Sequence, residues 1–451
     1  MKCCHQHVFP VLRPYLTFDI LGLSLKFLRG SMLKKKYTLP NGVRVIEEKI
    51  PYVRSVAIGI WVKTGSRFES PDTNGMAHFI EHMAFKGTKN RSARDIAETF
   101  DAIGGHVNAF TSKEYTCFYA RVLDEHVDVA LDVLHDMFFH STFDEGEMEK
   151  EKQVVIEEIR MVEDTPDDWI HDLASKASIP RHPLGYPILG PIENVSQFKS
   201  EDLKEYVKTH YTPDRTVITV AGNIPDTWRD EVTRWFGQFQ RERGGGQSVP
   251  SSPQFYPGIE QRVKPTEQAH FCLSLPGLAI HDPHIYDLTL LNSIVGGSMS
   301  SRLFQDIREA HGLAYSVYSY HLAYEDFGTF GIYAGTGLNQ TNRVYELILN
   351  ILRDVRENGV TKKELNKAKE QLKGSFTLSM ESTTNRMSRL GKNELMLGKH
   401  PSLDEVVEKI DSIQLDDVVQ LAERLFSGPL SFALISPHDD VPEAFRSDPN
   451  V

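Results

Sequence analysis

Cysteine is scarce in this sequence of 451 residues. The four cysteines are Cys3, Cys4, Cys117 and Cys272, and no regular spacing relates them. Small secreted folds held by disulfides carry even sets of cysteines at ordered intervals, so the sequence excludes that class. It indicates a protein of a reducing compartment, and we expect a cytoplasmic location.

Long apolar runs and long basic runs are missing as well. No stretch approaches the roughly 18 uncharged apolar residues that a membrane-spanning helix needs, so we predict no membrane span. Lysine and arginine total 50 against 62 aspartates and glutamates, which gives a formal net charge of −12. This acidic balance excludes a general nucleic-acid binder. With 40% hydrophobic and 25% charged residues, the composition is that of a globular protein with two or three domains.

Residues 1–31 differ from the rest of the chain. They hold four basic residues against a single acid, with an apolar patch over 16–28. A secretory or organellar targeting peptide is one interpretation. Asp19 and Lys26 interrupt the patch, however, and no small-residue cleavage site follows. We therefore favour the interpretation that Gly-Ser-Met at 30–32 marks a junction whose methionine starts the protein, and we expect residues 1–31 to be poorly packed.

Strand-like and helix-like patterns alternate after Leu33. The Asn41-Gly42 pair is a hairpin signal between two strand-like runs. A strand rich in valine, isoleucine and tryptophan is expected over 55–63. The patterns further predict helices over 93–103 and 124–140 and a strand pair within 106–123.

The chain contains an internal repeat. Residues 143–153 resemble residues 360–370 at an offset of 217, and each copy follows an amphipathic helix. A segment rich in glycine, proline and serine, 241–257, lies between the copies and suits a linker. The sequence therefore predicts two α+β domains of common ancestry, over 32–240 and 258–451.

One pentapeptide carries the strongest chemical signal. Residues 78–82 read His-Phe-Ile-Glu-His, the inverted zinc-peptidase pattern H-x-x-E-H. On a helix, His78 and His82 would lie one turn apart on the same face. Two imidazoles at that spacing can hold zinc, and Glu81 between them can accept a proton from a water at the metal. The alternative is a purely structural role, in which the two histidines are hydrogen-bonded on a half-buried helix and bind no metal.

A second acidic cluster completes the candidate site. Glu151 and Glu158 are two helical turns apart and therefore share one face. A catalytic zinc needs three protein ligands and an open position, and His78, His82 and Glu158 supply that number. Glu157 remains a rival ligand because only one of the adjacent pair can face the metal. Glu151 is expected to hydrogen-bond a ligating histidine, with a solvated helix charge as the alternative.

The second repeat lacks this set of residues. At the offset of 217, Ala368 replaces Glu151 and Ser375 replaces Glu158, and residues 286–295 contain neither histidine nor glutamate. We therefore expect one zinc ion per chain, held by the first domain.

Residues 33–438 resemble the zinc metallopeptidase family of pitrilysin, insulysin and the mitochondrial processing peptidase, and its short bacterial processing-peptidase-like members in particular. Four stretches carry the resemblance: Gly75-Met-Ala-His-Phe-Ile-Glu-His-Met83 with Phe85-Lys-Gly-Thr88, Gly105-His-Val-Asn-Ala-Phe-Thr111, Glu151 to Glu158, and Pro183-Leu-Gly-Tyr-Pro-Ile-Leu-Gly190. The resemblance implies an α+β fold of two homologous domains, each a mainly antiparallel sheet packed with helices, arranged as a half-clamshell. It implies that His78, His82 and Glu158 bind zinc and that Glu81 is the catalytic base.

The resemblance also implies substrate-binding residues. Asn108, Ala109 and Phe110 would belong to an edge strand to which an extended peptide adds by backbone pairing, and a plain internal strand is the alternative. Arg308 would anchor substrate backbone, and Tyr315 would hydrogen-bond the developing oxyanion. For these two the alternatives are a surface ion pair and a packed ring.

The sequence as a whole predicts a zinc-dependent endopeptidase acting on peptides or unfolded protein segments. We expect a homodimer, because two such chains would restore the four-domain chamber of the larger relatives, with Arg308 and Tyr315 acting on the partner's zinc. A non-catalytic scaffold protein is the rival class. A presequence-processing peptidase with a dedicated partner is a narrower alternative.

Overall fold

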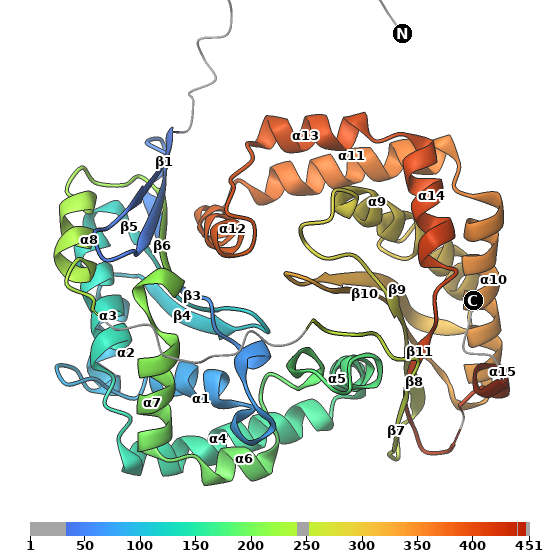
Figure 1. Cartoon of the computed structure of the whole chain (residues 1–451), viewed down its shortest axis with the longest axis horizontal. Coiled ribbons are helices and arrows are strands. Elements are labelled where there is room, and N and C mark those ends of the chain that lie inside the picture. The colour runs from blue at the N-terminus through green and yellow to red at the C-terminus, as the bar shows by residue number, and fades with distance from the viewer. Residues whose placement is uncertain (1–32, 241–251, 440, 448–451) are drawn as a thin grey trace, which may run out of the picture.

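The computed structural model describes residues 33–240, 252–439 and 441–447. The prediction for residues 1–31 and most of the predicted linker lie outside this range. Figure 1 shows two halves side by side, the first coloured blue to green and the second yellow to red, each built on one sheet. Among the described helices, none is long and apolar enough to cross a membrane.

The first half is built on a six-stranded sheet. Its strands are β1 (Leu33–Thr38), β2 (Arg44–Lys49), β3 (Ser55–Val62), β4 (His106–Thr111), β5 (Thr116–Leu123) and β6 (Thr216–Gly222), in the order β1-β2-β6-β3-β5-β4. All neighbours are antiparallel except β2 and β6. The predicted hairpin at Asn41-Gly42 joins β1 to β2, and β4 lies at an edge.

Helices cover one face of this sheet. They are α1 (Met76–Met83), α2 (Ala93–Ala102), α3 (Val127–His140), α4 (Glu145–Glu163), α6 (Ile192–Gln197), α7 (Ser200–His210) and α8 (Trp228–Phe236). Alternate residues of β3, such as Val56 and Ile58, pack against them in one large core. The predicted helix over 124–140 begins as a 3-10 turn, Asp124–His126, before α3.

The second half repeats this plan with five strands. They are β7 (Ile259–Val263), β8 (Gln268–Pro276), β9 (Ala314–Ala323), β10 (Gly328–Gly337) and β11 (Ser431–Ser436), in the order β7-β11-β8-β10-β9. Only β7 and β11 pair in parallel. The accompanying helices are α9 (Ile285–Val295), α10 (Thr341–Asn358), α11 (Lys362–Ser379), α13 (Leu403–Ser412), α14 (Leu415–Leu425) and α15 (Glu443–Ser447). The start of α11 lies 217 residues after that of α4, as the repeat predicts.

Each half lends one helix to the other half's sheet. Helix α5 (Pro166–Ser178) packs Ile170 and Leu173 against Cys272 of β8. Helix α12 (Thr383–Met396) packs Met387 and Leu390 against the inner face of the first sheet (Figure 1). The two sheets fall within the predicted ranges 32–240 and 258–451, but these two helices pack across that division.

Close packing and ion pairs hold α12 in place. Gly391 lies against the indole of Trp61, and a Cβ atom there would be 2.1 Å from Trp61 Cε2. The buried Glu394 pairs with Lys36 at 2.8 Å and with Arg44 at 3.3 Å. These contacts bind the second half to strands of the first.

Candidate metal centre

Helix α1 presents His78 and His82 on one face. It has eight residues and starts after Gly75, whose φ of +99° is a conformation that favours glycine. The two imidazole rings lie 4.6 Å apart between centroids, as the i, i+4 spacing predicts. His78 is only 8% exposed, so its ring is held by the packing of α1.

Helix α4 brings a carboxylate to this pair. Glu158 Oε2 lies 3.4 Å from His82 Nε2 and 3.8 Å from His78 Nε2. The three potential ligand atoms all lie within 4.8 Å of one another, and no other such group of metal-binding side chains exists among the described residues. The adjacent Glu157 points elsewhere, because its side chain is 68% exposed and pairs with Arg160 at 2.5 Å. Glu158 is therefore the acid that lies beside the histidines.

Glu151, two helical turns before Glu158 on α4, orients His82. Its buried carboxylate accepts a hydrogen bond from His82 Nδ1 at 2.8 Å and pairs with Lys86 at 2.5 Å. Because Nδ1 of His82 donates to Glu151, the other ring nitrogen, Nε2, is the one that faces Glu158. Burial alone would raise the pKa of Glu151, but the hydrogen bonds from His82 and Lys86 hold that pKa below its ordinary value.

The two histidines sit in opposite electrostatic environments. Burial, with the neighbouring imidazole of His82, lowers the pKa of His78 to about 4. Burial would also lower the pKa of His82, but its hydrogen bonds with Glu151 and Glu158 raise that pKa to about 9. His78 is thus a neutral donor, while two carboxylates favour positive charge around His82.

Glu81 lies beside the ligand group without belonging to it. Its carboxylate accepts a hydrogen bond from Thr111 Oγ1 at 2.6 Å. Burial raises the pKa of Glu81, the direction that suits a general base working near neutral pH. Thr111 is the last residue of β4, so the same contact ties the edge strand to the candidate base.

The predicted substrate strand is an edge strand. β4 pairs with β5 alone among the described strands, which removes the internal-strand alternative. The backbone N–H of Ala109 donates to the side chain of Asn108 at 2.9 Å. Phe110 lies on the face of the sheet opposite to Ala109, the face that α12 covers, with its ring centroid 5.6 Å from that of Trp61.

Arg308 and Tyr315 contact each other in the second half. The Arg308 guanidinium lies 4.8 Å from the centroid of the Tyr315 ring. Both line a cavity of about 440 Å³ next to Gly296 and Gly297, and Tyr315 is 76% exposed. Within the described chain, no hydrogen bond or ion pair joins either side chain to the group around His78. The structure therefore brings five of the predicted site residues together, and these two form a separate pair in the second half.

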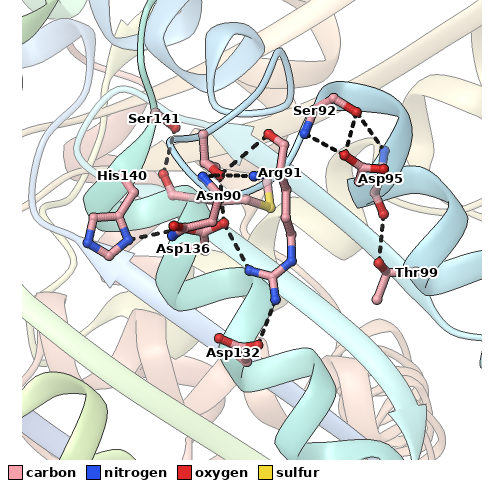
Figure 2. A network of polar contacts seen from close by, with 11 residues as sticks. Asn90, Arg91, Ser92, Asp95, Thr99, Asp132, Asp136, His140 and Ser141 are labelled. Atoms are coloured by element: carbon pink, nitrogen blue, oxygen red, sulfur yellow. Dashed lines mark hydrogen bonds and ion pairs between the residues drawn. The ribbon is translucent and has the colours of Figure 1, made fainter.

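A polar network anchors the loop that leaves α1 (Figure 2). The buried carboxylate of Asp136 on α3 accepts hydrogen bonds from Thr88, Asn90 and Arg91 at 2.6, 2.6 and 2.9 Å. Arg91 also reaches Asp132 at 2.7 Å. The chain after α1 is therefore fixed to the neighbouring helix.

Sequence reasoning missed two residues of the site. Thr111 holds Glu81, and Lys86 holds Glu151. Lys86 had no helical signal, because α1 ends at Met83 and Lys86 lies three residues beyond that end. Thr111 ends the stretch Gly105–Thr111 that carries part of the resemblance, but nothing in the sequence indicates its contact with Glu81, because that contact depends on how the sheet packs.

The donor set fits a zinc ion. Two imidazole nitrogens and one carboxylate oxygen are the ligands of many catalytic zinc sites, and three protein ligands leave one position open. Glu151 supplies the carboxylate that commonly supports a ligating histidine. The residues present therefore match the metal that the pentapeptide predicts.

Known protein families match most of the chain. The family model for Insulinase (Peptidase family M16) matches residues 44–192, and the model for the Peptidase M16 inactive domain matches residues 197–372. The chain is 56% identical over 408 residues to the "Uncharacterized zinc protease YmxG" of Bacillus subtilis, covering 90% of this chain and 99% of that protein. An "Uncharacterized zinc protease" of Streptomyces coelicolor is 40% identical over 417 residues and is covered to 90%, as is this chain.

Solved structures share the fold. A protease from Helicobacter pylori superimposes with a TM-score of 0.84 at 20% identity, over 90% of this chain and 99% of that one. A peptidase M16 inactive domain from Pseudomonas fluorescens gives 0.83 at 19% identity, over 91% and 98%. The predicted α+β fold with two domains is confirmed.

Proposed function

This chain belongs to the M16, or insulinase, family of zinc peptidases, and from that membership we propose that it is an endopeptidase for peptides and unfolded protein segments. The observation that carries the proposal is the convergence of His78, His82 and Glu158 within 4.8 Å, with Glu81 beside them. A scaffold protein would have no need to keep all four.

In this proposal, His78, His82 and Glu158 hold one zinc ion per chain. When bound, zinc supplies positive charge that lowers the pKa of a water molecule and polarises a peptide carbonyl. Glu81 accepts the proton of the attacking water and passes it to the leaving amine, which its raised pKa favours. Glu151 keeps the Nδ1 proton of His82 in place, and this fixes the tautomer throughout.

The free edge of β4 supports binding of substrate as an added strand. The Ala109 N–H is not used by β5 and instead donates to Asn108 Oδ1. A peptide carbonyl replaces that side-chain oxygen when an extended chain pairs with β4. Main-chain pairing tolerates many sequences, which suits an enzyme for unfolded segments. Phe110 then forms part of the wall beside the bound chain.

A homodimer completes the site in this proposal. Arg308 and Tyr315 lie in the half without the metal group, and Tyr315 is largely exposed. In a closed chamber of two chains, Arg308 of one subunit would anchor substrate backbone, and Tyr315 would donate a hydrogen bond to the substrate carbonyl bound in the other subunit's site.

The buried Cys117 and Cys272, which form no disulfide, support a reducing, cytoplasmic location.

The test is metal content together with cleavage of a mixed peptide pool. Protein purified without chelators should hold about one zinc per chain and cleave peptides internally, while Glu81→Gln should keep the zinc and lose cleavage. A well-folded protein that holds no metal would support the scaffold function instead. Mixing Glu81→Gln with Tyr315→Phe should recover activity if the chains complete each other, and no recovery would reject that arrangement.

A further inference from the structure

A buried carboxylate caps the helix that carries the two histidines. Glu69 is 3% exposed, and its Oε2 accepts hydrogen bonds from the Gly75 N–H at 2.9 Å and the Asn74 side chain at 3.0 Å. Its Oε1 accepts from the Ala77 N–H at 2.7 Å. Ala77 directly precedes His78. Glu69 therefore satisfies first-turn N–H groups of α1 that have no partner within the helix.

No residue at the ordinary capping position could do this. The N-cap is Gly75, and a Cβ there would lie 2.6 Å from the Leu189 carbonyl oxygen. Gly190 is part of the same close contact, and a Cβ on Gly190 would lie 2.3 Å from the Asn74 carbonyl oxygen. A serine or aspartate at 75 is thus excluded by the segment 183–190. The cap has to come from elsewhere in the chain, and Glu69 provides it.

The turn that carries Glu69 is itself rigid. Arg67 is buried and pairs with Glu114 and with Asp326 of the second half, both at 2.7 Å. Gly65 packs so closely that a Cβ would lie 2.1 Å from the Ser112 carbonyl oxygen. The carboxylate of Glu69 is therefore held in place by contacts that involve none of the candidate metal ligands.

His78 depends on the backbone for its position more than His82 does. His82 is fixed by its hydrogen bond to Glu151, whereas His78 Nδ1 has no hydrogen-bond partner in the described part of the chain. A two-turn helix such as α1 is marginal by itself, so loss of its cap frays the first turn, where His78 lies.

We propose that Glu69 is a positioning residue of the metal centre: by holding the first turn of α1, it places His78 and Glu81 correctly against Glu158. This inference rests on the proposed function for its effect on catalysis, but not for its effect on the helix. Glu69 lies outside the candidate ligand group, and it acts through the backbone of Gly75 and Ala77.

Glu69→Gln tests the proposal. Glutamine keeps the volume but replaces one acceptor oxygen with an NH₂ group, which faces either the Ala77 N–H or the Gly75 N–H. We expect the variant to fold, with zinc affinity and kcat each about 10- to 100-fold lower, as for other residues that orient metal ligands, and with KM nearly unchanged. Backbone amides over 76–83 should exchange hydrogen faster. In the milder variant Glu69→Asp the carboxylate is kept on a side chain one methylene shorter. This variant should give zinc affinity, kcat and exchange rates between those of the wild type and Glu69→Gln.

Ser402→Ala provides the matched control. It removes the side-chain cap of α13, whose Ser402 Oγ accepts from the Glu405 N–H at 3.1 Å, far from the metal group in sequence and in the other half. It should lower thermal stability without changing zinc affinity. Unchanged zinc affinity and unchanged α1 exchange in Glu69→Gln would overturn the proposal, as would an equal loss of zinc affinity in Ser402→Ala. If the wild type bound no zinc, the proposed function would fail, and the exchange of α1 amides would still decide the role of Glu69.

Discussion

The substitution Gly391→Ala tests how tightly α12 packs on the first sheet, because the added methyl group should destabilise the protein by crowding although alanine favours the helix. In Gly391→Ala the new Cβ would lie 2.1 Å from Trp61 Cε2 and 2.4 Å from Trp61 Nε1. Trp61 cannot move aside easily, because it is 1% exposed and its ring packs against Phe110 and Tyr115. Either α12 or the indole must therefore shift.

The magnitude follows from three contributions. Overpacking a well-filled core costs about 1–3 kcal/mol. Displacing Trp61 also weakens its hydrogen bond to Thr219 Oγ1, which measures 2.8 Å and contributes about 1 kcal/mol. Replacing a helical glycine by alanine offsets about 1 kcal/mol of this loss. Gly391→Ala should therefore lower the free energy of unfolding by about 1–3 kcal/mol.

Gly374→Ala is the matched control for this experiment. Gly374 lies within α11, and a Cβ there would meet nothing within 4 Å, so this variant should gain about 1 kcal/mol from propensity alone. Urea denaturation followed by tryptophan fluorescence should shift the two midpoints in opposite directions. If Gly391→Ala were as stable as Gly374→Ala, the tight contact between α12 and the first sheet would be refuted.

Three further outcomes follow from the metal centre and from the ion pairs on α12. Glu81→Gln should retain zinc and lose about 100- to 10,000-fold in kcat, and a loss of zinc instead would make Glu81 a ligand. Glu151→Gln should weaken zinc binding about 10- to 100-fold in a chelator competition, because His82 loses its carboxylate partner; equal affinity would contradict the orienting role. Burial opposes ionisation of Glu394, but its hydrogen bond with His400 and the nearby cations lower its pKa from 4.5 to about 2. The stability that Glu394 contributes is therefore present above pH 4.5 and lost as pH falls toward 2, so acid titration should destabilise the wild type more steeply than Glu394→Gln over that window.

Local periodicity predicted which of the candidate side chains lie together. Because α-helices repeat every 3.6 residues, the spacing of His78 and His82 and that of Glu151 and Glu158 determined which side chains share a face. The choice between Glu157 and Glu158 depended on how α4 is rotated toward α1, and only the packed structure gives that rotation.

Features that depend on residues far away in the sequence could not be predicted from it. The apolar residues of α12 show an ordinary helical pattern, and nothing in that pattern says that Met387 packs on the sheet of the other half. The cap on α1 comes from Glu69, six residues before the N-cap, so no capping signature appears in the sequence. In the proposed homodimer, the position of Tyr315 relative to the metal depends on a second chain, which a single sequence does not place.

The exchange of α5 and α12 is reciprocal. Helix α5 begins at Pro166 and α12 at Thr383, again 217 residues apart, so the two helices are equivalent elements of the repeat. A single repeat would leave one face of its sheet uncovered unless a second copy lent its helix. The arrangement thus resembles a swapped dimer held in one chain, in which the association of the two halves is intramolecular and does not depend on protein concentration. Within one chain the two halves carry different side chains, the imidazoles and acids in the first half and Arg308 and Tyr315 in the second.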